Sequence, residues 1–221
     1  MTPKKILITG ASGFTGREAV QYFRDQGYSV FGTARKRACD AILKADLTKR
    51  DEAFQMIKDV KPDYVLHLAG QNAVKTSWED PLATIEANLT ATLHVLEAIR
   101  NYQPGAKTIV VGSALEESLK QVPSHPYGLS KTMQSLVARK WAQLFQLHVV
   151  IVKPTNLIGP GFSNGVCASF AQQIAAQEKR NKPCTITISN PGIRRDFLDV
   201  RDAVKGYETI LEKGINGEVY E

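Results

Sequence analysis

The amino-acid sequence predicts an α/β protein with a doubly wound parallel sheet of the Rossmann type. A short apolar segment, residues 5–9, leads directly into a glycine-rich loop, residues 9–16, and a helical pattern follows. Apolar segments of strand length then alternate with helical patterns as far as residue 152. Strands and helices that alternate in this way form a parallel sheet with helices on both faces.

The first unit is a strand, a glycine loop, a helix and a second strand. The helix over residues 15–26 ends at Gly27, because glycine readily adopts the left-handed conformation that closes a helix. Residues 28–33 are expected to form the second strand. The elements that follow are expected as helix 51–60, strand 64–69, helix 81–100, strand 108–111, helix 127–145 and strand 148–152.

The sequence changes character after Lys153. Residues 156–165 are rich in glycine and proline and are expected to form a loop. The remaining elements are expected as helix 170–180, strands 185–188 and 197–200, helix 202–211 and a strand that begins near residue 217. We therefore divide the chain into a nucleotide-binding domain, residues 1–153, and a second part, residues 154–221, whose last elements return to the first domain.

The composition is ordinary for a globular protein and narrows the class. The 221 residues carry a net charge of +6, but basic residues do not gather with aromatic residues, so we do not expect a nucleic-acid partner. No apolar run is long enough to span a membrane, and the chain begins directly on a strand. Cys39, Cys167 and Cys184 lack metal-ligand spacing. We expect a cytoplasmic protein with no metal site.

The glycine loop has the pattern of a dinucleotide-binding loop. Gly10 permits a tight turn, Gly13 allows the backbone to approach a pyrophosphate, and Gly16 allows the helix to pack on the strand. The helix then presents free N–H groups and its positive dipole end to the phosphates. A glycine turn without a ligand is the simpler alternative, but the strand–loop–helix context favours a cofactor.

The end of the second strand predicts NADP rather than NAD. Enzymes that use NAD usually carry a carboxylate there for the ribose 2′-hydroxyl. This chain has Arg35 instead, which can pair with a 2′-phosphate with help from Lys36 or Arg37. A solvated basic turn is the alternative. Asp46 and Leu47 stand where a loop can meet the adenine, although Asp46 could equally cap a helix.

Three residues form the candidate catalytic group. Tyr127 and Lys131 are four residues apart and share one face of a helix, and an ammonium there is expected to lower the pKa of the phenol. Ser113 follows strand 108–111, and sites in open α/β sheets lie at such strand ends. Ser113 would bind a substrate oxygen, Tyr127 would transfer the proton, and Lys131 would tune Tyr127 and bind the cofactor ribose.

Other catalytic arrangements are not supported by the sequence. The four histidines, His67, His94, His125 and His148, do not pair at metal-ligand spacing. Ser113 does not stand in the G-x-S-x-G pattern of an esterase. His125 could touch a substrate because it stands two residues before Tyr127, but an ordinary loop role is the simpler interpretation.

Taken together, these motifs resemble the extended short-chain dehydrogenase/reductase family of sugar-nucleotide epimerases, dehydratases and reductases. The matching segments are Thr-Gly-x-x-Gly-x-x-Gly at 9–16, His-Leu-Ala-Gly at 67–70, Asn88, Ser113, Tyr127 with Lys131, Lys-Pro-Thr-Asn and Ile-Gly-Pro-Gly at 153–161, and Arg-Asp-Phe-Leu-Asp-Val-Arg-Asp at 195–202. The resemblance covers essentially the whole chain. It implies an oxidoreductase or epimerase that binds NADP, with NAD as the alternative, and acts on a nucleotide-sugar.

The resemblance also implies individual site residues. The implied cofactor contacts are Gly10, Ser12, Gly13, Phe14, Thr15, Gly16, Arg35, Asp46, Leu47, Leu68, Ala69, Gly70, Tyr127, Lys131 and Pro154. The implied substrate contacts are Asn156 and Arg195, whose alternative is an ion pair with Asp199 or Asp202. A homodimer through helices 81–100 and 127–145 is implied, with Trp141 and Phe145 as contacts unless they pack in the core.

Within this family, the strand end at 31–35 and the segments 74–78 and 156–161 look most like GDP-4-dehydro-6-deoxy-D-mannose reductases. Reduction of a 4-keto sugar nucleotide is therefore the expected activity. An epimerase is the close alternative, and a non-enzymatic dinucleotide-binding sensor or scaffold is the alternative of another class.

Several positions depart from the family pattern. Dehydratases carry an acidic residue shortly after the catalytic Ser or Thr; here Leu115 stands two positions after Ser113 and Glu116 comes one step later, which argues against dehydration. The segment between Ser113 and Tyr127 is short, Lys153 replaces the commoner Arg, and Gly70 the commoner Ala. The family also continues beyond the last strand seen here, so residues 154–221 are expected to form a partial substrate lobe.

Overall fold

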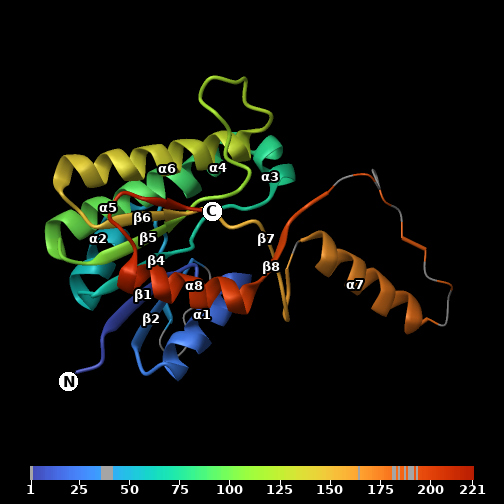
Figure 1. The fold of residues 1–221 in the computed structure, drawn as a ribbon, viewed down its shortest axis with the longest axis horizontal. Helices are drawn as coiled ribbons and strands as arrows, with labels where there is room; N and C mark the ends of the chain where they lie inside the picture. Colours follow the sequence, from blue (N-terminus) through green and yellow to red (C-terminus); the bar gives the residue numbers. More distant parts are fainter. Residues whose placement is uncertain are drawn as a thin grey trace.

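The protein is described by a computed structural model over residues 2–35, 42–163, 165–180, 183, 185–186, 188, 192 and 194–221. Among these residues, seven strands form one sheet in the order β3-β2-β1-β4-β5-β6-β9, and each neighbouring pair is parallel (Figure 1). The strands are β1 (Lys5–Thr9), β2 (Ser29–Ala34), β3 (Ile42–Lys44), β4 (Tyr64–His67), β5 (Lys107–Val111), β6 (Val149–Val152) and β9 (Val219–Tyr220). The predicted Rossmann-type α/β fold is confirmed.

Helices cover both faces of the sheet (Figure 1). Helices α1 (Phe14–Asp25) and α8 (Val200–Lys213) lie together on one face, and α2 (Arg50–Val60), α5 (Ala91–Tyr102) and α6 (Pro126–Phe145) lie on the other. Successive residues of β1 point to opposite faces. Leu7 therefore packs in the core under α2, α5 and α6, whereas Ile6 and Ile8 pack under α1 and α8.

The carboxyl ends of the central strands meet at one edge of the sheet. In the register, Thr9 pairs with both Thr33 and His67, His67 pairs with Val110, and Val111 pairs with Val152. The chain crosses from β1 to β2 on one side and reaches β4 on the other, so the strand order reverses beside β1. Ligands bind open α/β sheets at this kind of switch point.

The helix expected over residues 81–100 has three parts. Helix α4 (Pro81–Ile85) begins where the Asp80 carboxylate accepts a hydrogen bond from the Ala83 N–H. A π-helical turn, η1 (Glu86–Thr90), follows and continues into α5. A short helix that was not predicted, α3 (Val74–Glu79), precedes them. The π turn carries Asn88, and such turns often occur at functional sites.

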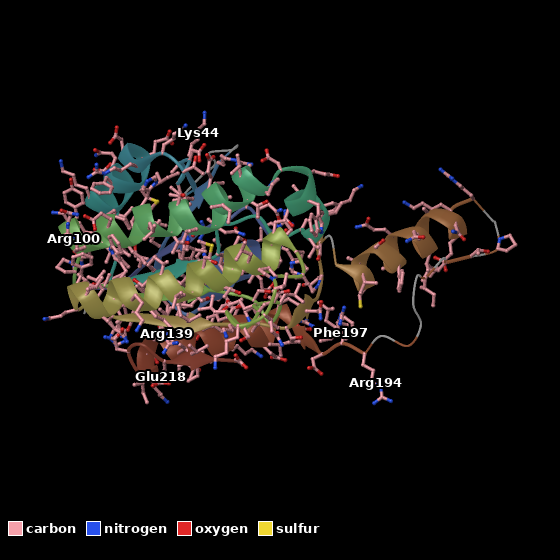
Figure 2. All side chains as sticks on the ribbon, turned by 90° about the horizontal axis from the view of Figure 1, so that it is seen from above. Lys44, Arg100, Arg139, Arg194, Phe197 and Glu218 are labelled. Carbon is pink, nitrogen blue, oxygen red and sulfur yellow. The ribbon has the colours of Figure 1, made fainter. Side chains whose placement is uncertain are left out.

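A second, smaller sheet extends from the main body. Strands β7 (Asn156–Ile158) and β8 (Phe197–Asp199) pair in parallel, although the former was predicted to be a loop. Helix α7 (Val166–Glu178) has no buried residue, and Figures 1 and 2 show it projecting away from the seven-stranded sheet. Of the strand expected at 185–188, the structure describes Thr185, Ile186 and Ile188, and none of these belongs to a strand.

The remaining predicted elements are found within a few residues of their expected bounds. Among the described residues no helix has the length and apolar character that crossing a bilayer requires.

Candidate active site

The glycine loop is closely packed at the switch point. Gly10 has a φ of 69°, and a Cβ there would lie 2.9 Å from the backbone N of Ala69, at the end of β4. A Cβ on Gly16 would overlap the Gly10 carbonyl oxygen, and one on Gly13 would lie 3.1 Å from the same oxygen. A side chain at position 10 or 16 would overlap the backbone, and one at position 13 would be tightly packed, so the glycines leave the loop backbone free to approach a ligand.

The first helix presents its positive end to this loop. Gly13 is the N-cap of α1, no side chain caps the helix, and its first turn holds no acidic residue. Ser12 and Gly13 are exposed, and Phe14 and Thr15 are half-buried. A diphosphate is the kind of ligand that uncapped N–H groups and the dipole would bind. The residues present thus fit a dinucleotide.

The end of β2 carries a positive charge. Arg35 follows Ala34 and is exposed, while the predicted helpers Lys36 and Arg37 lie outside the described residues. Burial raises the pKa of Asp46. Hydrogen bonds from Thr48 and the charges of Arg35 and Lys49 lower it by more than burial raises it, so the net shift of the pKa is downward. Arg35 is therefore close enough to Asp46 for its charge to act on the carboxylate.

Asp46 does not cap the following helix. Its carboxylate accepts hydrogen bonds from the N–H and the hydroxyl of Thr48, whereas the N-cap of α2 is Lys49. The side chain of Leu47 is buried in the core, and its carbonyl accepts a hydrogen bond from His94 Nδ1 at 3.0 Å. Any contact of Leu47 with a ligand would therefore use its backbone.

Core packing and hydrogen bonds hold the loop after β4 in place. Leu68 packs against the core under α1 and α8, and the Ala69 N–H donates to the Thr9 hydroxyl at 3.1 Å. A Cβ on Gly70 would lie 2.6 Å from Asn88 Oδ1, so the side chain of Asn88 leaves no room for the commoner alanine. Asn88 in turn accepts from the Gln71 N–H and donates to the Ser130 hydroxyl.

Tyr127 and Ser113 lie beside each other at this edge. Tyr127 is on the first turn of α6, whose N-cap is His125: the Nδ1 atom of His125 accepts from the Gly128 N–H at 2.7 Å. His125 thus has the structural role that was the simpler interpretation. The Ser113 hydroxyl accepts from the Leu115 N–H at 3.1 Å, which fixes its orientation.

The pKa of Tyr127 departs from the sequence expectation. Burial raises the pKa of this phenol, a hydrogen bond with Ser113 lowers it, and the charge of Glu116 raises it; the net direction is up. Lys131 is absent from these causes, so the expected lowering by its ammonium is wrong for this arrangement. The phenol is protonated at neutral pH, which suits a proton donor.

Lys131 is held by the protein core rather than by Tyr127. Its ammonium donates to the Val111 carbonyl at 2.8 Å and to Gln134 Oε1 at 2.7 Å. Burial lowers the pKa of Lys131 to about 8, while the Glu116 charge raises it. A charged group is expensive to bury, so these acceptors are what keep the ammonium in place.

A buried hydrogen-bond chain connects Lys131 with the glycine loop. Gln134 Nε2 donates to the Thr92 hydroxyl, which donates to the Asn88 carbonyl. Because the Thr92 hydrogen is used, His67 Nε2 must donate to Thr92 at 2.9 Å. Burial lowers the pKa of His67 to about 3, so the ring is neutral and its Nδ1 accepts from the Thr9 hydroxyl at 2.9 Å.

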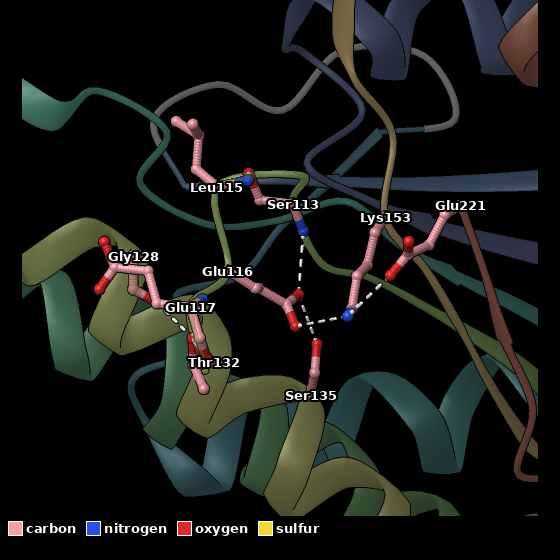
Figure 3. A network of polar contacts seen from close by, with 9 residues as sticks. All are labelled: Ser113, Leu115, Glu116, Glu117, Gly128, Thr132, Ser135, Lys153 and Glu221. Atoms are coloured by element: carbon pink, nitrogen blue, oxygen red, sulfur yellow. Dashed lines mark hydrogen bonds and ion pairs between the residues drawn. The ribbon is translucent and has the colours of Figure 1, made fainter. Parts of the chain in front are cut away.

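Glu116 is a site residue that the sequence argument missed. Its carboxylate accepts from the Ser113 N–H at 3.0 Å and from the Ser135 hydroxyl at 2.7 Å, and it pairs with the Lys153 ammonium at 3.5 Å (Figure 3). Nothing in the spacing of these residues along the chain indicated that they meet.

The predicted substrate residues lie farther out. The Asn156 side chain donates to the Asp196 carbonyl at 3.0 Å and links β7 to the start of β8. Arg195 is exposed on the segment before β8. Its suggested ion-pair partners are paired otherwise, Asp199 with Arg201 and Asp202 with Lys205. Pro154 lies beside the loop after β5, where its carbonyl accepts a hydrogen bond from the Ala114 N–H.

Within the described ranges, no group of three or more His, Cys, Asp or Glu side chains is arranged to hold a metal ion.

Comparison with known proteins gives a consistent result. A family model described as the NAD dependent epimerase/dehydratase family matches residues 6–221. A GDP-6-deoxy-D-mannose reductase of Pseudomonas aeruginosa is 28% identical over 98% of this chain and 73% of its own length. A CDP-paratose 2-epimerase of Salmonella typhi is 26% identical over 94% of this chain and 74% of its own.

A solved structure agrees with these relatives. The structure of RMD from Pseudomonas aeruginosa, complexed with NADPH, superposes with a TM-score of 0.83 at 27% identity. The match covers 99% of this chain and 75% of that one.

Proposed function

The chain belongs to the NAD dependent epimerase/dehydratase family, whose members are enzymes that use a nicotinamide dinucleotide on sugar nucleotides, and we propose that it is an NADP-dependent reductase of a 4-keto sugar nucleotide. The observation that carries this proposal is the protonated, buried phenol of Tyr127 beside the Ser113 hydroxyl. A reductase needs a proton donor at this point, and the upward direction of the Tyr127 pKa keeps that proton available.

The chemistry divides between the cofactor and the protein. When bound, the reduced nicotinamide supplies the hydride. Tyr127 gives its proton to the substrate oxygen that becomes the alcohol. The Ser113 hydroxyl accepts from the Leu115 N–H and has one hydrogen to donate, which it would give to the same substrate oxygen. The Lys131 ammonium, held by the Val111 carbonyl and Gln134, would bind the ribose of the cofactor.

Two observations argue against dehydration. Leu115 has no acid–base chemistry, and its side chain is 43% exposed. The carboxylate of Glu116 is occupied by the Ser113 N–H, the Ser135 hydroxyl and the Lys153 ammonium. A dehydratase would need a free carboxyl group there to remove water.

The cofactor proposed is NADP. Arg35 at the end of β2 favours it, because a guanidinium can bind a 2′-phosphate through two parallel hydrogen bonds. The described end of β2 offers Ala34 and Arg35 and no carboxylate that would select a ribose 2′-hydroxyl.

Residues 154–221 are proposed to form the substrate side of the site, with Asn156 and Arg195 as contacts. A homodimer through α5 and α6 is also proposed. Leu144 on α6 is 72% exposed and supports an apolar contact, whereas Trp141 packs against the core under α5 and α6 and does not.

The experiment is NADPH consumption by the purified protein with GDP-4-keto-6-deoxymannose, with NADPH binding measured in parallel. Steady consumption by the wild type, lost by about 10²-fold or more in Tyr127→Phe without loss of NADPH binding, supports the proposal. NADPH binding without consumption of this substrate would overturn GDP-4-keto-6-deoxymannose as the substrate, and the same result with other 4-keto sugar nucleotides would overturn the reductase in favour of an epimerase or a binding protein.

A further inference from the structure

Glu116 connects the loop after β5 with helix α6 and with the segment after β6. Its side chain is 7% exposed. The carboxylate holds the Ser113 N–H after β5, the Ser135 hydroxyl on α6, and the Lys153 ammonium after β6 (Figure 3). A buried carboxylate with partners from three elements is fully used by the protein and is not waiting for a ligand.

The local sequence makes room for this carboxylate. A Cβ on Gly112 would overlap Glu116 Oε1, so only glycine at the end of β5 allows the carboxylate to lie against the strand. Lys153 is itself shared, because its ammonium also pairs with Glu221 at 3.1 Å. Lys153 and Glu116 line a cleft of about 290 Å³ together with Ser135, Arg139 and Val219.

We propose that Glu116 is a positioning residue for the reaction: its carboxylate fixes the backbone of Ser113 beside Tyr127. This inference rests on the proposed reductase function. It follows from the hydrogen bond to the Ser113 N–H. That bond and the bond from Leu115 N–H to the Ser113 hydroxyl together define where the hydroxyl lies.

The charge of Glu116 supports the same role. Glu116 raises the pKa of Tyr127 and also that of Lys131. The other charged groups around it are Lys153 after β6, Glu221 after β9, Arg139 and Lys131 on α6, and Glu117 beside it in the chain. Removing the Glu116 charge takes away one of the two carboxylates that pair with Lys153. The loss of the negative charge and the less balanced positive charge of Lys153 both favour the phenolate form of Tyr127.

A matched pair of variants tests the proposal. Glu116→Gln keeps an oxygen for the Ser113 N–H but removes the charge. Glu117→Gln makes the same charge change one residue later, where the carboxylate bonds instead to Ser124. In Glu116→Gln we expect kcat to fall by about tenfold or more, since small displacements of catalytic groups have effects of this order, while KM for NADPH stays the same.

The pH profile separates positioning from simple loss of fold. In Glu116→Gln the alkaline limb of kcat moves to lower pH, because the Tyr127 proton is lost more easily, and in Glu117→Gln it does not move. The amide resonance of Ser113 gives a readout without turnover. It shifts upfield in Glu116→Gln, since a hydrogen bond to a carboxylate becomes one to a neutral amide, and stays in place in Glu117→Gln.

Stability gives a further check. Lys153→Met leaves the Glu116 carboxylate buried without a cation and lowers Tm, and Glu116→Gln combined with Lys153→Met restores part of the loss. An unmoved Ser113 resonance, or equal pH profiles in the two Gln variants, would overturn the inference. A wild-type protein that binds NADPH but consumes none would refute the proposed function instead, and the Ser113 resonance would still decide the positioning role.

Discussion

The ammonium of Lys131 donates to the side-chain carbonyl of Gln134, 2.7 Å away and one turn along α6. This contact fixes the orientation of the Gln134 amide, because lysine can only donate. The amide nitrogen of Gln134 then donates to Thr92, which bonds to His67. The candidate catalytic lysine is thereby connected through the core to the strand that carries the glycine loop.

Replacing Gln134 with methionine should weaken both stability and turnover. Among the described residues, the change leaves Lys131 with the Val111 carbonyl as its remaining hydrogen-bond acceptor, and we expect a loss of about 1–3 kcal/mol in the free energy of unfolding. The control is Gln143→Met on the exposed side of the same helix, where Gln143 accepts from Lys140 at 3.1 Å. Urea unfolding and steady-state kinetics of both variants test this prediction. Equal effects of the two substitutions would contradict the role of Gln134 in holding the buried Lys131 ammonium.

His67 should make the protein sensitive to acid. Its pKa is lowered in the folded protein to about 3 from an ordinary 6.5, so the unfolded chain binds the proton more tightly. The free energy of unfolding therefore decreases as pH falls from 6.5 towards 3, by at most about 1.4 kcal/mol per pH unit.

Urea unfolding of the wild type and of His67→Gln at several pH values tests this prediction. The variant is less stable at neutral pH because it disturbs the bonds to Thr9 and Thr92, but the difference between the two proteins should shrink in acid. A difference that stays constant with pH would show that His67 does not contribute this dependence.

Arg35 should determine the choice between the two cofactors. In Arg35→Asp the KM for NADPH is expected to rise by about tenfold or more. The guanidinium proposed to pair with the 2′-phosphate is replaced by a carboxylate, which repels the phosphate because both are negative. NADH should be used more readily than by the wild type. Arg24→Asp makes the same change in charge at an exposed position in the last turn of α1. Unchanged cofactor preference in Arg35→Asp would refute the role of Arg35.

Gly70 should not tolerate the alanine that is commoner in the family. The added Cβ would lie 2.6 Å from Asn88 Oδ1, so Asn88 must move and its bonds to Gln71 and Ser130 weaken. We expect a loss of about 1–3 kcal/mol in the free energy of unfolding.

The matched control is Gly206→Ala on α8, where a Cβ would meet nothing within 4 Å. Alanine favours a helix interior over glycine, so this variant should gain about 0.5–1 kcal/mol. Thermal and urea unfolding of the two variants should thus move in opposite directions, and a neutral Gly70→Ala would contradict the packing described here.

The sequence was sufficient for six of the seven strands of the main sheet because their signals are local. The glycine loop, the apolar strands and the Gly27 helix end each depend on neighbouring residues, and the parallel sheet follows from their order. Short elements were missed. Strand β3 has three residues with one face exposed, and β7 lies in a segment whose glycines and prolines indicated a loop. Such strands form because a partner strand is present, which no local pattern reveals.

The candidate site was also predicted only in part, because its local motifs can be recognised in the sequence and its tertiary contacts cannot. The family motifs and the positions after the strands indicated Ser113, Tyr127 and Lys131, and the sheet register brings their elements to one edge. The partners of these residues could not be predicted. Gln134 and Glu116 reach the site through tertiary packing, and burial raised the pKa of Tyr127 where the sequence suggested that Lys131 would lower it.

The most direct test of the account follows the hydrogen that is transferred. The protein is supplied with GDP-4-keto-6-deoxymannose and NADPH that carries deuterium at the transferable position of the nicotinamide, and the sugar product is analysed by mass spectrometry and NMR. We predict one deuterium on the carbinol carbon for each NADP⁺ formed. A sugar product without deuterium, or formed without stoichiometric oxidation of NADPH, would contradict the proposed reductase.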